Sequence, residues 1–159
     1  MEDYKMKKLI VSVSVAMLSI AGFAAAPSST WFKTSDKGQI NCENIRIGTS
    51  KARIALENGE KIAVSLEDLD SYSIDGKVYD KKMVYKDGKS TGKMTYMRLI
   101  ESQNGLSLYE SAELDYESID PLQTYNKYYV YNGEAMHLAL NEASLPSVFN
   151  FFGVKWSYR

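Results

Sequence analysis

Asn-Gly and Asp-Gly pairs recur along this chain between segments in which apolar and polar residues alternate. Such pairs adopt the left-handed backbone that tight turns require, and they are the strongest short-range hairpin signal. Local hairpin pairing needs no long crossover, so the chain is predicted to be mainly β. We expect an antiparallel β-meander of about eight strands, open or barrel-like, built around turns at Asn58-Gly59, Asp75-Gly76, Asn104-Gly105 and Asn132-Gly133.

The apolar pattern predicts the register at three of these turns, because a slip of one residue moves every side chain to the other face. Three-residue loops ending at Gly59 and Gly105 give the cleaner apolar face, whereas a two-residue loop suits Asp75-Gly76. The segment 86–92 is expected to be a longer, solvated connection. The expected pairs are Ile54 with Ile62, Tyr72 with Tyr79, and Ile100 with Leu108.

The turn at Asn132-Gly133 leaves two registers open. A three-residue loop places Tyr128 and Val130 opposite Met136 and Leu138, and a two-residue loop places Tyr129 and Tyr131 there instead. In either case the alternation puts Met136, Leu138 and Leu140 on one apolar face, with His137 on the other.

The last element follows a different period. Leu145, Val148, Phe149 and Phe152 fall on one stripe of a helix. Ser144 precedes them as a candidate N-cap, and Gly153 follows as a left-handed terminator. The pattern predicts one short C-terminal α-helix over Leu145–Phe152, packed on the sheet.

The N-terminal segment is typical of a secretory signal peptide. Met6-Lys7-Lys8 supplies positive charge, Leu9–Ile20 is apolar, and residues 22–26 are mostly small. The alternative is a retained anchor, since a membrane span needs roughly 20 apolar residues. We therefore expect a signal peptide over 1–24, a flexible lead-in over 25–43, a single β-rich domain over 44–159, and no membrane span after cleavage.

Composition excludes several classes of function. A formal net charge of −1 gives no electrostatic reason to expect nucleic acid or an anionic membrane as partner. The single histidine excludes multi-histidine zinc sites, and no phosphate-binding loop is present, so no metal or cofactor is expected. The single cysteine, Cys42, cannot form an internal disulfide, which favours a bacterial periplasm or exterior. We interpret it as a structural residue, with a reactive thiol as the alternative.

Three groups of polar residues have competing interpretations. His137 is expected to be a solvated strand residue, with a general base as the alternative. The acidic run is expected to be a solvated loop, with calcium binding as the alternative. Asp68 and Asp70 are the least arbitrary candidates for the paired carboxylates of a glycoside hydrolase. The acidic run comprises Glu110, Glu113, Asp115, Glu117 and Asp120.

Tyrosine is the compositional oddity of the chain. Tyr125, Tyr128, Tyr129 and Tyr131 lie in one expected strand and therefore on both of its faces. An exposed row of rings would suit stacking against sugars or extended peptides. The alternative is that these rings pack in cross-strand pairs, because tyrosine is a preferred strand former. With His137, these tyrosines are the candidate binding residues.

Several segments resemble a group of small exported proteins of unknown function from the Bacteroidetes. The resemblance implies a Gram-negative envelope, periplasmic or secreted location, and it carries no catalytic residues. The similar segments are 71–79, 84–89, 104–109, 128–131 and 145–153.

These observations favour a non-enzymatic exported β-domain that binds a partner, either an envelope protein or a glycan. One alternative is an envelope-polymer hydrolase using paired carboxylates. Another is an architectural subunit that associates through edge strands.

Overall fold

The computed structural model describes residues 30–114 and 124–156, and these form one ten-stranded antiparallel sheet and a short helix. The mainly β prediction is therefore confirmed, and the sheet is open. The elements are β1 (Trp31–Thr34), β2 (Gln39–Ile47), β3 (Lys51–Leu56), β4 (Lys61–Ser65), β5 (Leu69–Ile74), β6 (Lys77–Lys86), β7 (Lys89–Gln103), β8 (Leu106–Leu114), β9 (Thr124–Asn132), β10 (Ala135–Ala139) and α1 (Leu145–Phe151).

The strand order is not a simple meander. It runs β10-β9-β8-β7-β6-β5-β1-β2-β3-β4, so β1 is inserted between β2 and β5. Phe32 of β1 pairs with Ile40 on one side and Tyr72 on the other. The expected lead-in over 25–43 is therefore wrong from Trp31 onward, because these residues form a central strand and the start of the next. Residues 25–29 lie outside the described part.

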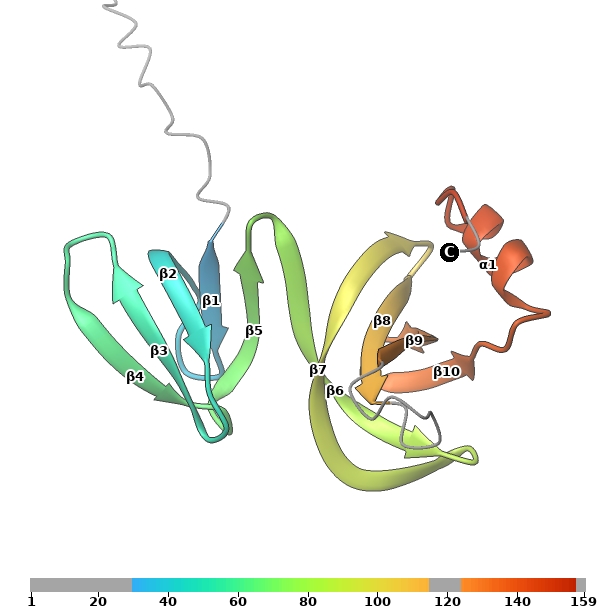
Figure 1. The fold of residues 1–159 in the computed structure, drawn as a ribbon, viewed down its shortest axis with the longest axis horizontal. Coiled ribbons are helices and arrows are strands. Elements are labelled where there is room, and N and C mark those ends of the chain that lie inside the picture. Colours follow the sequence, from blue (N-terminus) through green and yellow to red (C-terminus); the bar gives the residue numbers. More distant parts are fainter. Residues whose placement is uncertain (1–29, 115–123, 157–159) are drawn as a thin grey trace, which may run out of the picture.

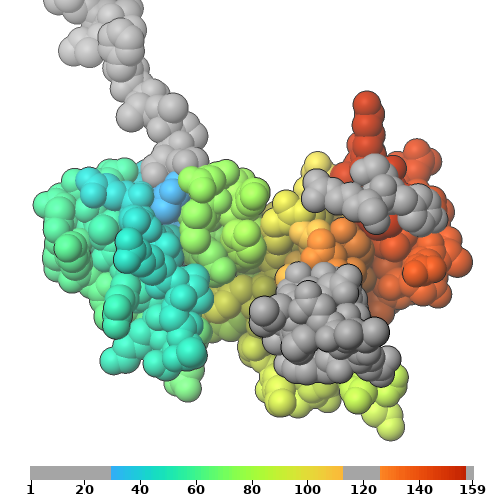
Figure 2. Space-filling view, in the orientation of Figure 1, coloured from blue at the N-terminus to red at the C-terminus, as the bar shows by residue number. Residues whose placement is uncertain are grey.

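The sheet curls in two halves around opposite faces. In the first half, Ile62 and Val64 of β4 pack against the core that contains Leu69 and Tyr72 of β5. In the second half β6 meets the β9–β10 hairpin, where the Tyr131 hydroxyl donates to the Met83 carbonyl at 2.7 Å. Figure 1 shows β6 and β7 running between the two halves, and Figure 2 shows the blue-to-green and yellow-to-red residues on either side.

The first half has one core and the second half has two. Tyr79 packs against the first core, and its neighbour Asp80 points to the other face, where Tyr109 is buried. Tyr128 lies in register with Tyr79 and packs with the helix, so the second half buries both faces of the sheet. The first core contains Phe32, Cys42, Ile45, Ala52, Ile54, Leu69 and Tyr72. The tyrosine core contains Met97, Tyr109, Tyr129 and Tyr131. The helix core contains Leu108, Val130, Phe149 and Phe152.

Two predicted registers are confirmed. Ile54 pairs with Ile62, and Gly59 adopts a φ of 83° in the loop between them. Tyr72 pairs with Tyr79 across Asp75-Gly76, and their rings stack with centroids 4.9 Å apart.

Other registers are changed by bulges. The predicted pair Ile100 with Leu108 is wrong, because Asn104-Gly105 forms a two-residue turn and a bulge at Ile100 brings Glu101 opposite Leu108. The expected long connection over 86–92 is also wrong. Lys86 pairs with Lys89 across Asp87-Gly88, so β7 starts at once.

The β9–β10 hairpin follows neither of the two registers that the sequence left open, because its turn is at Gly133-Glu134 and Asn132 pairs with Ala135. Met136 pairs with Tyr131, and after an irregularity at His137, Leu138 pairs with Val130. A bulge adds one residue and so reverses the alternation beyond it. Met136 consequently packs on the tyrosine core and Leu140 on the helix core, so the expected common apolar face is wrong.

The C-terminal helix is confirmed, one residue shorter than predicted. Phe149 and Phe152 are buried against the sheet. The Gly153 amide donates to the Asn150 carbonyl and the Val154 amide to the Phe149 carbonyl. With a φ of 68° at Gly153, this is a Schellman terminator. The Ser144 hydroxyl bonds to Asn141 instead of capping the helix.

Within the described ranges, no helix combines the length and the apolar character needed to cross a membrane.

Candidate functional site

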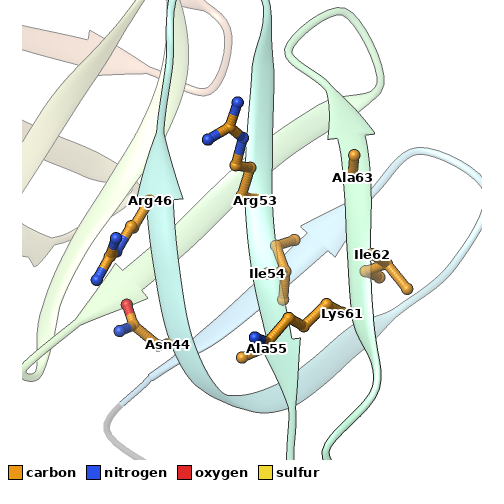
Figure 3. Close-up of a pocket in the computed structure, with 8 residues that line it drawn as sticks. All are labelled: Asn44, Arg46, Arg53, Ile54, Ala55, Lys61, Ile62 and Ala63. Atoms are coloured by element: carbon orange, nitrogen blue, oxygen red, sulfur yellow. The ribbon is translucent and has the colours of Figure 1, made fainter.

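A shallow hollow lies on the outer surface of β2, β3 and β4, on the side away from the first core (Figure 3). Its volume is about 540 Å³. Ala55 and Ala63 leave room in its floor, because Ala55 lies between the longer Asn44 and Lys61, and Ala63 lies opposite Arg53 on the edge strand. We call it the basic hollow, and its polar and small lining residues are Asn44, Arg46, Arg53, Ala55, Lys61 and Ala63.

Strand alternation places the charges in the basic hollow. Ile45 and Ile54 point into the first core, so Arg46 and Arg53 point outward. These two arginines are direct cross-strand partners, and Arg53 is in turn opposite Ala63. In Figure 3 the Lys61 side chain extends along the hollow toward Ala55 on β3. Three cationic side chains therefore project from three adjacent strands.

An adjoining concavity extends the positive charge toward the β2–β3 turn. It shares Arg46, Arg53 and Ala63 with the basic hollow and adds Lys51, and no acidic residue lines either concavity. Gly48 makes this turn tight, because a β-carbon there would lie 2.9 Å from the Lys51 carbonyl oxygen.

The arginines of the basic hollow have no acidic partner among the described residues, whereas Arg98 does. Arg98 donates from Nε to Glu110 Oε2 at 2.6 Å and from its other guanidinium arm to the same carboxylate. Like charges directly opposite in a sheet are unfavourable. Two exposed, opposed and unpaired guanidinium groups are suited to an external anion, since the guanidinium fork matches carboxylate, sulfate or phosphate oxygens.

The tyrosines predicted to bind a partner are used for packing. Tyr129 and Tyr131 are buried in the tyrosine core, with 7% and 0% of their surface exposed. Tyr128 is half-buried, and its ring contacts Phe149 and Trp156 edge-on. Tyr129 and Tyr131 are therefore not part of an exposed row but are packed in the tyrosine core, and binding by these residues stays a prediction. The side chain of Tyr125 lies outside the described residues.

His137 is exposed at the irregularity in β10, the last strand of the sheet. No nucleophile contacts it in the described part of the chain. Its placement fits a solvated strand residue.

Within the acidic run, Glu110 is not free for a cation. Its other oxygen, Oε1, accepts hydrogen bonds from Asn126 at 2.9 Å and Tyr128 at 3.0 Å. No group of three potential metal ligands occurs in the ranges 30–114 and 124–156. The side chain of Glu113 and residues Asp115, Glu117 and Asp120 lie outside the described part.

The two candidate carboxylates for hydrolysis line different concavities. Asp68 lies beside Thr34 and Asp36, whereas Asp70 lies beside Asp80 and accepts a hydrogen bond from Ser35 at 2.9 Å. They do not share one cleft.

Cys42 is 1% exposed in the first core, and desolvation raises the pKa of its thiol, with a smaller contribution from Glu57. This environment fits the structural interpretation.

Sequence reasoning missed the basic hollow although a signal was present. Arg46 lies between Ile45 and Ile47, and Arg53 between Ala52 and Ile54, which is the alternation of a half-buried strand. Their cross-strand pairing depends on the turn over 48–50, which lacks an Asn-Gly or Asp-Gly pair.

No protein-family model, curated protein or solved structure matches this chain.

Proposed function

We propose that this protein is a non-enzymatic binding module of the bacterial envelope, and that its basic hollow binds an acidic glycan. The observation that carries the proposal is the opposed, unpaired pair Arg46 and Arg53 in a concavity without acidic residues. The signal-like N-terminus supports an exported location, where acidic polysaccharides are available partners.

A polymer of uronic acid fits the shape and charge of this surface. Its carboxylates repeat along a chain, and the cations of the basic hollow and its extension also form a row across strands. Bidentate arginine–carboxylate bonds are among the stronger hydrogen bonds in proteins. Binding of this kind weakens with salt, because exposed charges are screened within about 8 Å at physiological ionic strength.

The test is calorimetric titration with polygalacturonate, with neutral dextran as the ligand control. We expect binding of polygalacturonate alone, and at least about tenfold weaker binding by Arg46→Gln/Arg53→Gln, which corresponds to about 1.4 kcal/mol. The matched control is Lys86→Gln/Lys89→Gln, which removes another directly opposed basic pair from the β6–β7 turn. It should leave binding unchanged.

Three outcomes would overturn the proposal. The first is no binding of polygalacturonate at low salt. The second is an equal loss in the control variant, which would indicate attraction by overall charge. The third is the release of new reducing ends from the polymer, which would favour the hydrolase alternative. Export is tested separately by fractionating cells that express the full chain.

A further inference from the structure

A second concavity lies on the same face of the sheet as the basic hollow, away from the first core, where the two halves meet. Its volume is about 610 Å³. β1, β5 and β6 supply one cross-strand row to it: Lys33 pairs with Ser71, and Ser71 pairs with Asp80. Neighbouring strands are about 4.8 Å apart, so the backbones of Lys33 and Asp80, which lie two strands apart, are separated by about 10 Å. We call this concavity the junction cleft.

Lys33 forms the cationic wall of the junction cleft, and a buried lysine, Lys82, lies on the opposite wall two residues after Asp80 on β6. The Lys82 side chain is 8% exposed. Its Nζ atom donates to the Gly133 carbonyl and to Glu134, both at 3.2 Å, and lies 5.4 Å from the centroid of the Tyr109 ring. Burying an ammonium group is costly unless it is compensated. These contacts hold the positive charge in a fixed place beside the cleft.

The anionic wall is fixed as well. The Tyr109 hydroxyl donates to Asp80 Oδ2 at 2.6 Å, and the Ser35 hydroxyl donates to Asp70 Oδ1 at 2.9 Å. A carboxylate has about four acceptor sites, so each of these groups keeps acceptor capacity toward the cleft.

Ser71 links the two walls. It is 8% exposed, it lines the cleft, and its hydroxyl has no hydrogen-bond partner among the described residues. The hydroxyl oxygen itself is not fully buried, so it is accessible from the cleft and can donate to a ligand.

We propose that the junction cleft binds a small zwitterion, either a free α-amino acid or a short peptide with unblocked ends. Asp80 and Asp70 accept from the ligand's ammonium group. Lys33 and the Ser71 hydroxyl bind its carboxylate. The separation of the walls favours a dipeptide, since each extended residue spans about 3.3–3.6 Å. This site shares no residue with the basic hollow and does not depend on the glycan proposal.

Calorimetric titration with L-alanyl-L-alanine and with L-alanine tests the proposal and distinguishes a peptide ligand from a free amino acid. We expect the dipeptide to bind, and its N-acetylated and C-amidated forms to bind at least about tenfold more weakly. Asp80→Asn keeps an oxygen to accept from Tyr109 and removes the charge. It should also weaken dipeptide binding at least about tenfold, while polygalacturonate binding remains unchanged.

Lys33→Gln is the second variant and Lys77→Gln its control. The Lys33 side chain has no hydrogen bond or ion pair within the described residues, so its replacement should leave the fold intact. It should still weaken dipeptide binding several-fold. Lys77 is exposed and lies outside the cleft, and its replacement should have no effect. The proposal is overturned if neither zwitterion binds at millimolar concentration, if the blocked dipeptides bind as well as the free one, or if Lys33→Gln binds like wild type.

Discussion

Tyr131 joins strands that are not neighbours in the sheet, and its replacement by phenylalanine tests how the second half is closed. The side chain is fully buried, and its hydroxyl donates to the Met83 carbonyl of β6 at 2.7 Å. Tyr131→Phe keeps the ring and removes this hydrogen bond. Leaving a buried acceptor without its donor costs about 1–3 kcal/mol, so the variant should be less stable by that amount at pH 8.

The same hydroxyl makes the difference depend on pH. Burial raises the pKa of Tyr131 to about 12, with smaller contributions from Tyr129, Tyr85 and Glu134. The phenol of the unfolded chain ionises near pH 10. Below pH 10 ionisation of Tyr131 therefore does not change the free energy of unfolding of wild type. Between pH 10 and 12 ionisation of Tyr131 stabilises the unfolded state relative to the folded state. The free energy of unfolding of wild type therefore falls by about 1.4 kcal/mol at pH 11 and by about 2.7 kcal/mol above pH 12.

The phenylalanine variant has no such ionisation at position 131. Tyr72 and Tyr96, whose pKa values burial also raises to about 12, destabilise both proteins alike at high pH. The stability difference between wild type and Tyr131→Phe should consequently shrink by about 1.4 kcal/mol between pH 8 and pH 11.

Urea unfolding followed by tryptophan fluorescence measures the difference at both pH values. Phe152→Leu is the control, because it weakens the helix core at a ring whose aromatic contact is Phe151 and not a tyrosine. Its destabilisation should be the same at pH 8 and pH 11. A Tyr131→Phe difference that is equally independent of pH would refute this account of the buried hydroxyl.

Three further changes test other features. Phe149→Ala removes a 5%-exposed ring from the helix core and should lower the free energy of unfolding by about 3–5 kcal/mol in urea titrations. Gly153→Ala places a β-carbon on a residue with a φ of 68° and should lower the free energy of unfolding by about 1 kcal/mol. The control is Gly38→Ala, which should be nearly neutral because a β-carbon there meets nothing within 4 Å. Thermal unfolding distinguishes the two variants. Cys42, buried and with a raised thiol pKa, should react with Ellman's reagent only as fast as the protein unfolds, and immediate labelling of the native protein would contradict this.

The sequence predicted the features that depend on nearby residues. The turn at Asp75-Gly76 and the loop ending at Gly59 set their registers through left-handed glycines, and the stripe ending at Phe152 set the helix. Each depends on a few consecutive residues whose backbone preferences and apolar spacing agree.

The features that escaped prediction depend on distant contacts. The insertion of β1 beside β5 joins Phe32 to Tyr72, and nothing local specifies that pairing. The bulges at Ile100 and His137 let each strand change face as the sheet curls. Tyr131 is buried for the same reason, because a flat meander would have left one face of its strand in solvent. The basic hollow and the junction cleft both form across strands that only the folded sheet brings together.

The position of β1 also bears on the order in which the chain can fold. Trp31–Thr34 directly precedes β2 in the chain and can pair with it at once, but its other edge stays open until residues 69–73 have followed. Completing the middle of the sheet therefore waits for a loop of some forty residues to close, which is the kind of contact that slows folding. Deleting only this short strand should remove the cooperative unfolding of the first half, whose core is shared by β2, β3 and β5, and leave that of the second half.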